Sequence, residues 1–487
     1  MHGVPVSGLV LIPITLGIFC FSSYLPEWAV FVSVLQGAAL VNVGGGFAVG
    51  LSPYFFVAAL IASQLLPQWL TGRIRFFPGE PAWLQTRVLA LFAFWSAISA
   101  LMLPVLFAGL PVDSARAGGV DKNYYTQTAL SLSGSNVGQA GYMILNFVMV
   151  VCLVQVAIQP GRLNRLVKAF SWSGVFVVAV GAYQILCKRV GLPFPTSFFN
   201  SNAAWSQLPD QYIGVGYSFS RLSATFAEPS EAASFLGAWA VFELSLAIFG
   251  GRGTGWHWVW ATVGSIMLVA TTSTTGYLTA GIMWLAMAYD CGLKILRYGW
   301  IRTKAAIAVV ALAGFAVIWL LVSPTAWPLL DAVLFSKVQS QSALHRTSTF
   351  GRAVVVFQNS WGLGAGLGSN RAMSVFFYIL SNLGFPGILL VTFLLTHLYL
   401  QVRQGLQRSK GEASTRAFLV ALASAFGANL IALLASGAEV TQPRLWVLWG
   451  LLLATIRYGW VMDRYREMGI SSLRRMRNGI LEIYEFA

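Results

Sequence analysis

The sequence predicts an all-α polytopic integral membrane protein with about 12–14 transmembrane helices, and three observations support this fold class. Of the 487 residues, 57% are hydrophobic and only 10% are charged, whereas roughly a quarter of residues are charged in soluble domains. The mean hydropathy is +0.70. Apolar runs of about 17–25 residues, long enough to cross a hydrocarbon core as helices, recur along the whole chain.

The apolar runs also indicate how the chain is divided. No basic residues precede the first run, so we expect a retained helix rather than a signal peptide. A glycine-rich stretch, NVGGGFAVG, follows the second run and leaves the number of N-terminal helices open. We expect helices near 7–25, 28–46, 51–70, 88–110, 140–158, 169–186, 231–249, 258–271, 275–292, 305–322, 374–400, 417–435 and 444–461.

These helices give a coarse organisation of the chain. The sequence predicts N-terminal helices with a first long outer loop (1–139), central helices (140–322), a large periplasmic loop (323–373), C-terminal helices (374–461) and a basic cytoplasmic tail (462–487).

The net charge of +15 would suggest a nucleic-acid partner in a soluble protein. Here most basic residues fall in alternate connections and in the C-terminal tail, which is the pattern of cytoplasmic loops. We therefore expect a multi-pass protein of a bacterial inner membrane, with a cytoplasmic C-terminus and no nucleic-acid partner.

The cysteines predict neither a disulfide framework nor a zinc site. They fall in or beside different apolar runs without the spacing of metal ligands. We expect no metal and no cofactor. The cysteines are Cys20, Cys152, Cys187 and Cys291.

Arginines in the remaining connections are unusual, because the outer face of such a protein rarely carries them. Arg221 lies in one outer segment, and Arg346, Arg352 and Arg371 lie in another. An anionic ligand would explain them.

The stretch RLSATFAEPSEAASFLGAW, residues 221–239, indicates how such a ligand is bound. Pro229 suits the first position of a helix, and Glu228 before it suits the cap. The amides at this helix start form an anion site, to which Arg221 adds a bidentate guanidinium. The alternative is that Glu228 and Glu231 only complement the helix dipole while Arg221 pairs with one of them.

Alternating glycines between 362 and 368 lie between Arg352 and Arg371. They match neither the dinucleotide-binding nor the P-loop pattern. They suit either a tight loop whose bare backbone approaches a ligand or a simple turn that re-enters the membrane.

Three smaller features have both a functional and a structural interpretation. Hydroxyls of the turn TTSTTGYLTAG, residues 271–281, could bind sugars or phosphates, but such groups more often cap helices. Glu243, inside a predicted helix, is either functional or paired with a polar neighbour. His345 alone is more often a hydrogen-bonded surface histidine than a catalyst.

With these residues considered together, the chain resembles the bacterial O-antigen polymerase and O-antigen ligase superfamily, and most of all its exopolysaccharide polymerases. The resemblance covers roughly residues 140–460: an R-x-x-x-x-F-x-EPS segment, an S-T-T-G-Y turn and a large outer loop, in that order. The matching residues are Arg221, Phe226, Glu228, Pro229, Ser230, Arg352, Trp361, Gly364, Gly366, Gly368, Ser369, Arg371 and Ala372.

The resemblance implies a GT-C-like fold and a metal-independent transfer of a glycan from polyprenyl diphosphate on the periplasmic face. Ligases of the superfamily carry a histidine about eleven residues before the glycine that is Gly384 here, and Met373 occupies that position. Because a methionine cannot exchange a proton, polymerase is favoured over ligase.

The chemistry assigns roles to these residues. Guanidiniums at a low-dielectric boundary stabilise a diphosphate leaving group, and an acceptor hydroxyl needs a base. We expect Arg352 and Arg221 to be catalytic, with Glu228 as the base and His345 as the second choice. The residues expected to bind the diphosphate or the glycan are Arg346, Arg371, Ser230, Ser273, Thr274, Gly366, Gly368 and Ser369.

The expected partners are undecaprenyl-diphosphate-linked repeat units, membrane lipids and, as a candidate, a co-polymerase that regulates chain length. An O-antigen ligase-type transferase is the nearest alternative function. A flippase or exporter of lipid-linked oligosaccharides is the alternative from another class, and it predicts charges deep within helices and internal repeats.

Overall fold

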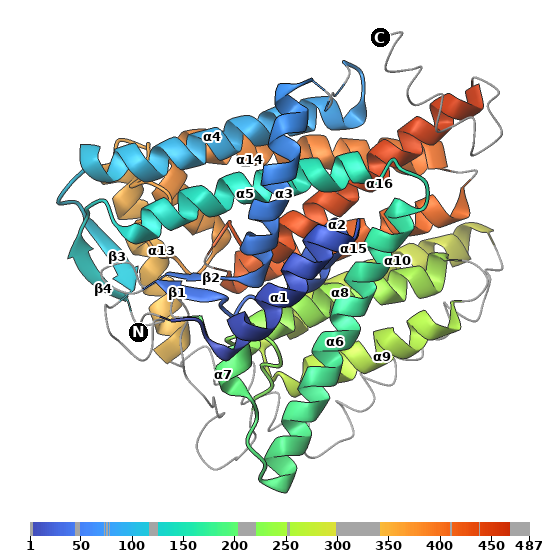
Figure 1. Cartoon of the computed structure of the whole chain (residues 1–487), viewed down its shortest axis with the longest axis horizontal. Helices are drawn as coiled ribbons and strands as arrows, with labels where there is room; N and C mark the ends of the chain where they lie inside the picture. Colours follow the sequence, from blue (N-terminus) through green and yellow to red (C-terminus); the bar gives the residue numbers. More distant parts are fainter. Residues whose placement is uncertain are drawn as a thin grey trace.

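The computed structural model is a bundle of long helices with two short β-hairpins (Figure 1). It describes residues 3–43, 49–72, 74, 76, 78–115, 125–202, 221–250, 254–298, 341–409, 412–437 and 439–467. Within these ranges, eight helices are long and apolar enough to cross a membrane. The chain is therefore an all-α polytopic membrane protein, as the sequence predicts.

The helices and strands follow one another in a simple order. The first half contains α1 (Val6–Phe21), α2 (Leu25–Val32), β1 (Val41–Val43), β2 (Val49–Leu51), α3 (Pro53–Leu70), α4 (Pro81–Leu106), β3 (Pro111–Ala115), β4 (Tyr125–Ala129), α5 (Gly134–Val156) and α6 (Arg162–Val190). The second half contains α7 (Thr196–Phe199), α8 (Pro229–Phe249), α9 (Gly255–Ala270), α10 (Thr274–Tyr298), α13 (Gln341–Asn359), α14 (Val375–Arg408), α15 (Ala413–Ser436) and α16 (Pro443–Glu467).

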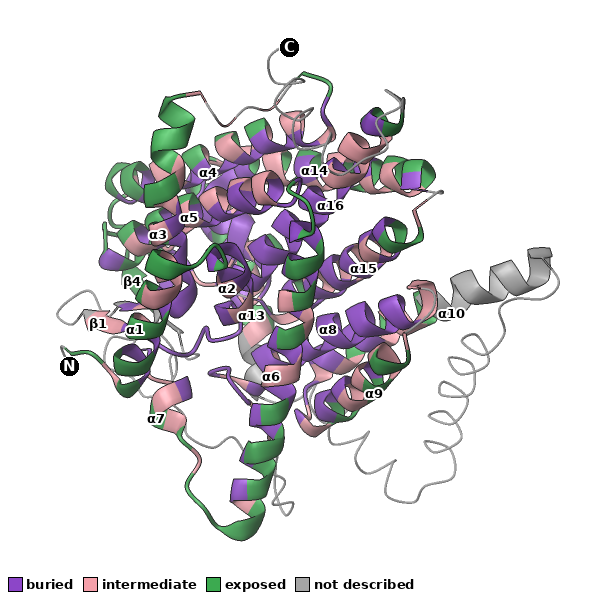
Figure 2. Cartoon of the chain, turned by 45° about the vertical axis from the view of Figure 1, so that its right-hand side comes forward, coloured by how far each residue is buried: buried purple, intermediate pink, exposed green. Residues whose placement is uncertain are grey.

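Helix α8 forms the centre of the bundle and is buried along almost its whole length (Figure 2). Its Trp239 is fully buried between glycines of two neighbouring helices. A Cβ atom at Gly174 of α6 would lie 2.0 Å from the Trp239 ring, and one at Gly264 of α9 would lie 2.8 Å from it. Glycine at these two positions lets both helices approach the indole, so the pattern of small residues sets the packing.

Two predicted elements differ from the structure. The helix predicted near 28–46 ends at Val32, and the chain then turns into β1, which pairs antiparallel with β2. Gly37, in the intervening stretch, lies so close to neighbouring backbone that a Cβ there would be 2.7 Å from the Phe199 carbonyl oxygen. The predicted loop 323–373 is helical over Gln341–Asn359.

Other predictions fall outside the described residues. They are the helix near 305–322, the first part of the loop at 323–340 and the tail from 468 onward.

The bundle has two chemically different ends. We call the end at which α5, α8, α14 and α16 begin the site end, and the end at which α4 and α6 begin and α16 finishes the basic end. The β3–β4 hairpin and α13 lie at the site end, away from the end of α16 (Figure 1).

Candidate functional site

Three helix starts meet at the site end. Arg444, in the first turn of α16, donates through Nη1 to the backbone carbonyl oxygen of Glu231 in the first turn of α8, at 3.0 Å. Its Nη2 donates to Oε1 of Gln442 at 2.7 Å. Gln139 of α5 donates to Oε2 of Glu439, just before α16, at 3.2 Å. The positive dipole ends of α5, α8 and α16 therefore point into one region.

Arg352 of α13 is held by a buried carboxylate. Its Nε donates to Oδ2 of Asp113 at 2.6 Å, and the Asp113 side chain is only 1% exposed. Asp113 belongs to β3, whose backbone joins the glycine loop: the Asp113 amide donates to Asn370 Oδ1 at 2.9 Å, and the Arg371 amide donates to the Asp113 carbonyl oxygen at 2.8 Å. Asp113 thus fixes the guanidinium beside the loop while the Arg352 side chain remains 31% exposed.

Arg371 follows the glycine loop and lies beside a carboxylate that also contacts α5. Its Nη2 is 3.9 Å from Oε1 of Glu439, and the two side chains are 27% and 18% exposed. This distance is at the limit of an ion pair, so the contact between Arg371 and Glu439 is a weak one.

Arg221 and Arg346 bring like charges together. Burial lowers the pKa of the Arg221 guanidinium; the neighbouring Glu228 carboxylate opposes this shift, and the positive charge of Arg346 lowers the pKa further. Tyr277, in the first turns of α10, also acts on Arg221. An anionic ligand near both guanidiniums would offset their mutual repulsion.

The glycine loop packs between helices. Gly364 and Gly366 have φ angles of +85° and +96°, which glycine adopts without strain. A Cβ at Gly366 would lie 2.5 Å from the carbonyl oxygen of Ser99 in α4, and one at Gly368 would lie 3.0 Å from that of Ser135 in α5. The bare backbone therefore approaches protein at these positions, which accounts for both glycines without a ligand.

Ser369 is also fully engaged within the protein. Its Oγ donates to the Ala365 carbonyl oxygen at 2.8 Å and accepts from Asn136 Nδ2 at 2.8 Å. Its amide and that of Asn370 both donate to Oδ1 of Asn382. Asn136 and Asn382 thus hold the loop in place, and Ser369 serves the loop's conformation.

The start of α8 matches its prediction. Pro229 is the first helical residue, and Glu228 precedes it with an extended backbone, φ −133° and ψ 145°. The Glu228 carboxylate makes no capping hydrogen bond and instead accepts from Ser230 Oγ at 3.2 Å. Ser273 and Thr274, at the start of α10, lie near Tyr277, and Ser273 is buried.

Two other candidate residues are placed differently. Glu243, in the interior of α8, accepts from Ser171 of α6 at 2.5 Å and contacts Nδ1 of His257 in α9 at 2.6 Å. This is the structural alternative that the sequence left open. His345 lies in α13, and its side chain is outside the described residues.

Sequence reasoning missed several side chains of the site. Arg444 and Gln442 belong to the short connection GAEVTQPR, residues 437–444, which carries charge on the face where arginine is unusual. The charge in this connection is the sequence feature that could have identified Arg444 and Gln442. Asp113 had no such signal, because only the pairing of β3 with the loop brings it to Arg352.

Comparison of the sequence with protein-family models and with curated proteins finds no match. The residues that the structure describes contain no group of three or more histidine, cysteine or acidic side chains that could hold a metal ion.

Proposed function

We propose that the chain is a polysaccharide polymerase, which transfers a growing glycan from polyprenyl diphosphate onto a lipid-linked repeat unit at the site end. One observation carries the proposal: arginines from separate segments of the sequence gather where several helices begin. They are Arg221 before α8, Arg346 and Arg352 in α13, Arg371 before α14 and Arg444 in α16. Such a concentration of positive charge at a membrane boundary suits a lipid diphosphate.

In the proposed reaction, the acceptor hydroxyl attacks the anomeric carbon of the donor glycan. A new C–O bond forms, the bond from that carbon to the diphosphate oxygen breaks, and the diphosphate leaves with the electron pair. Arg352 supports this step because Asp113 holds its Nε while the side chain as a whole remains 31% exposed. A guanidinium that is already oriented needs no reorganisation as charge develops on the leaving group.

The hydroxyl proton needs an acceptor, and Glu228 is our first choice. Its carboxylate lies beside Arg221 and accepts a hydrogen bond from the Ser230 hydroxyl. A general base typically contributes about 10²–10⁴-fold to a rate. Glu228→Gln should therefore lose about that factor, whereas His345→Ala should keep most of the activity; the reverse result would move the base to His345.

The resemblance to the O-antigen polymerase and ligase superfamily implies this function, and with it we propose that the site lies on the periplasmic face of a bacterial inner membrane. Met373 argues against the ligase alternative. The exporter alternative expects charges deep within helices, and Glu243 is accounted for by its contacts with Ser171 and His257.

The test is reconstitution. Purified full-length protein in liposomes is supplied with undecaprenyl-diphosphate-linked repeat units from the native host, without nucleotide, and the products are separated by length. We expect a ladder of longer lipid-linked glycans. Transfer to lipid A core without a ladder would favour the ligase function, and transbilayer movement of unchanged repeat units would favour the exporter.

A further inference from the structure

Glu439 is a partly exposed carboxylate at the site end, and the reaction proposed above gives it no role. It lies just before α16, and its side chain is 18% exposed. Its Oε2 accepts a hydrogen bond from Gln139 Nε2 at 3.2 Å, and its Oε1 is 3.9 Å from Arg371 Nη2. The Arg371 side chain is 27% exposed. Both side chains are therefore partly accessible to a ligand.

A chain of buried hydrogen bonds holds the Glu439 carboxylate in place. The amide oxygen of Gln139 accepts from Thr441 Oγ1, so its Nε2 is directed to Glu439. The Thr441 carbonyl oxygen accepts from Asn146 Nδ2 at 2.9 Å, and Asn146 Oδ1 accepts from the Tyr54 hydroxyl at 3.0 Å. Satisfied polar networks of this kind rigidify their members. The carboxylate is thus oriented before any ligand binds.

The charges around Glu439 differ in sign from those around Arg221. Arg221 and Arg346 are two cations, and an anionic ligand offsets their repulsion. Arg371 and Glu439 are a cation beside an anion. A diphosphate that approached the Glu439 carboxylate would be repelled by it.

Hydrogen-bonding capacity indicates which ligand suits the Arg371–Glu439 pair. A carboxylate only accepts hydrogen bonds, and a guanidinium only donates them. The oxygens of an ionised diphosphate also only accept, so they cannot bond to Glu439. A hydroxyl both donates and accepts. The hydroxyls of a sugar can therefore donate to Glu439 and accept from Arg371.

Glu439 is also close in the contact network to Arg352. The Arg371 amide donates to the Asp113 carbonyl oxygen at 2.8 Å, and Asp113 Oδ2 accepts from Arg352 Nε at 2.6 Å. Arg371 thus lies between the Glu439 carboxylate and the arginine expected to bind the diphosphate. Because a guanidinium has several N–H donors, Arg371 can contact a sugar and a phosphate at the same time.

We propose that Glu439 binds the glycan of the lipid-linked substrate by accepting a hydrogen bond from a sugar hydroxyl next to the diphosphate. An oxygen of the same sugar accepts from Arg371. This assignment rests on the proposed function, because it takes the substrate to be a glycan on a polyprenyl diphosphate. It adds a glycan subsite, held by α5 and the segment before α16, to the arginines that bind the diphosphate.

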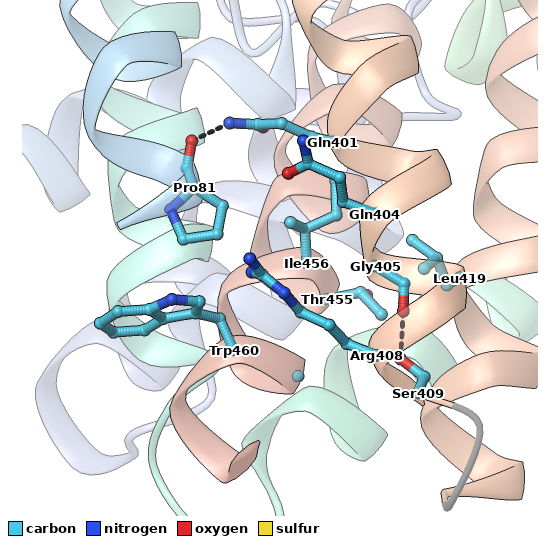
Figure 3. A pocket seen from close by; sticks show the side chains of 11 residues that line it. Pro81, Gln401, Gln404, Gly405, Arg408, Ser409, Leu419, Thr455, Ile456 and Trp460 are labelled. Carbon is cyan, nitrogen blue, oxygen red and sulfur yellow. Dashed lines mark hydrogen bonds between the residues drawn. The ribbon is translucent and has the colours of Figure 1, made fainter. Parts of the chain in front are cut away.

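The basic end supplies a matched control. Glu412, just before α15, is 24% exposed, close to the 18% of Glu439. The pocket between the ends of α14 and α16 has room for about one water molecule (Figure 3). Gln401, which lines it, donates to the Pro81 carbonyl oxygen of the protein itself. This pocket is too small for a sugar, so Glu412→Gln should not change glycan binding.

The test compares two lipids on the purified full-length protein by native mass spectrometry. One is undecaprenyl diphosphate, and the other is the same lipid carrying the repeat unit of the native host. The wild-type protein should bind the glycan-bearing lipid about tenfold more tightly. Glu439→Gln should weaken binding of that lipid about fivefold, because a neutral acceptor forms a weaker hydrogen bond. Its affinity for undecaprenyl diphosphate should not fall, because the substitution removes a negative charge.

Three results would overturn the role of Glu439. They are equal binding of the two lipids by the wild-type protein, a wild-type preference in Glu439→Gln, and a loss of affinity for undecaprenyl diphosphate itself in that variant. In the ladder assay, Glu439→Gln should raise the KM for repeat units several-fold with kcat little changed. A kcat lower by about 10²–10⁴-fold with unchanged binding would instead make Glu439 the general base.

The binding measurement separates this inference from the proposed function. If no ladder forms but Glu439→Gln still loses the preference for the glycan-bearing lipid, the glycan subsite stands and the polymerase function fails. If the ladder forms and the preference is unchanged in Glu439→Gln, the function stands and the glycan subsite is wrong.

Discussion

The two ends of the bundle use arginine in opposite ways. At the basic end, Arg162 and Glu27 are 7% and 9% exposed and pair at 2.8 Å, and Arg457 and Glu80 are 0% and 3% exposed and pair at 3.2 Å. At the site end, Arg371 is 3.9 Å from its carboxylate, and the charge of Arg346 acts on Arg221. The basic end holds ion pairs in which both side chains are buried, whereas the site end brings like charges together and leaves the paired Arg352 31% exposed.

This difference teaches that burial of the arginine itself, rather than of its partner, separates a structural arginine from one available to a ligand: Asp113 is 1% exposed, but Arg352 is 31% exposed. A buried ion pair adds little net stability, but the loss of one partner leaves an uncompensated charge. Buried arginines such as Arg457 should therefore affect folding, and partly exposed ones such as Arg352 should affect turnover.

The largest effect is expected at Arg457. Arg457→Ala leaves the Glu80 carboxylate buried without its cation and removes the hydrogen bond from Nη1 to Gln155 Oε1. The free energy of unfolding should fall by about 3–5 kcal/mol. Thermal denaturation in detergent, followed by circular dichroism, would measure it.

A double variant provides the control. Arg457→Met with Glu80→Leu removes both charges, so it should recover much of the stability lost in Arg457→Ala. In both variants, the folded fraction of the protein should form glycan polymer at the wild-type rate. A reduced rate per folded molecule would contradict the purely structural role of this end.

The second effect is at Arg352. Arg352→Lys keeps a positive charge near Asp113 but loses the planar fork that presents terminal nitrogens to a diphosphate. We expect Arg352→Lys and Arg352→Ala each to lose at least about 2 kcal/mol of transition-state stabilisation. The rate of polymer formation should therefore fall at least roughly 30-fold in both variants. The in vitro ladder assay measures it.

The amount of protein and its melting temperature are measured alongside activity for both Arg352 variants. Because Asp113 is buried, Arg352→Ala carries a risk to folding that Arg352→Lys largely avoids. Wild-type activity in a well-folded Arg352→Lys protein would reduce Arg352 to a general electrostatic contribution. Catalysis would then depend on Arg221 and Arg371.

Much of the fold follows from the sequence, because apolar length and proline position are local signals. The start of α8 was predicted from Glu228 and Pro229, and the structure confirms it. Helix α13 was missed because its polar composition resembles a loop. Its buried Ala353 and Val356, three residues apart, are the helical signal that could have identified it.

The site was only partly predictable, because its contacts are long-range. Arg221 and Arg352 were singled out as charges on an unusual face. Asp113 reaches Arg352 across 239 residues of sequence through a short strand, and no local pattern encodes that pairing. The glycines were assigned to a ligand, whereas the backbone of neighbouring helices already explains Gly366 and Gly368.

A smaller effect is expected at Arg346. Its charge disfavours the cationic form of Arg221, so Arg346→Ala removes a possible ligand contact and also relieves this repulsion. The two consequences oppose each other, and polymer yield should fall less than about tenfold. A loss as large as that of Arg352→Lys would instead make Arg346 as important as Arg352 to the stabilisation of the leaving group.

The smallest effect is expected from a chelator. If guanidiniums such as Arg352 and Arg371 stabilise the leaving diphosphate, a divalent cation has no charge left to neutralise there. The described residues also offer no cluster of ligands for such an ion. Polymerisation in millimolar EDTA should therefore match the untreated rate within about twofold. A strict requirement for added magnesium or manganese would show that the arginines of the site end do not suffice, and it would remove the contrast between the two ends on which the proposed mechanism depends.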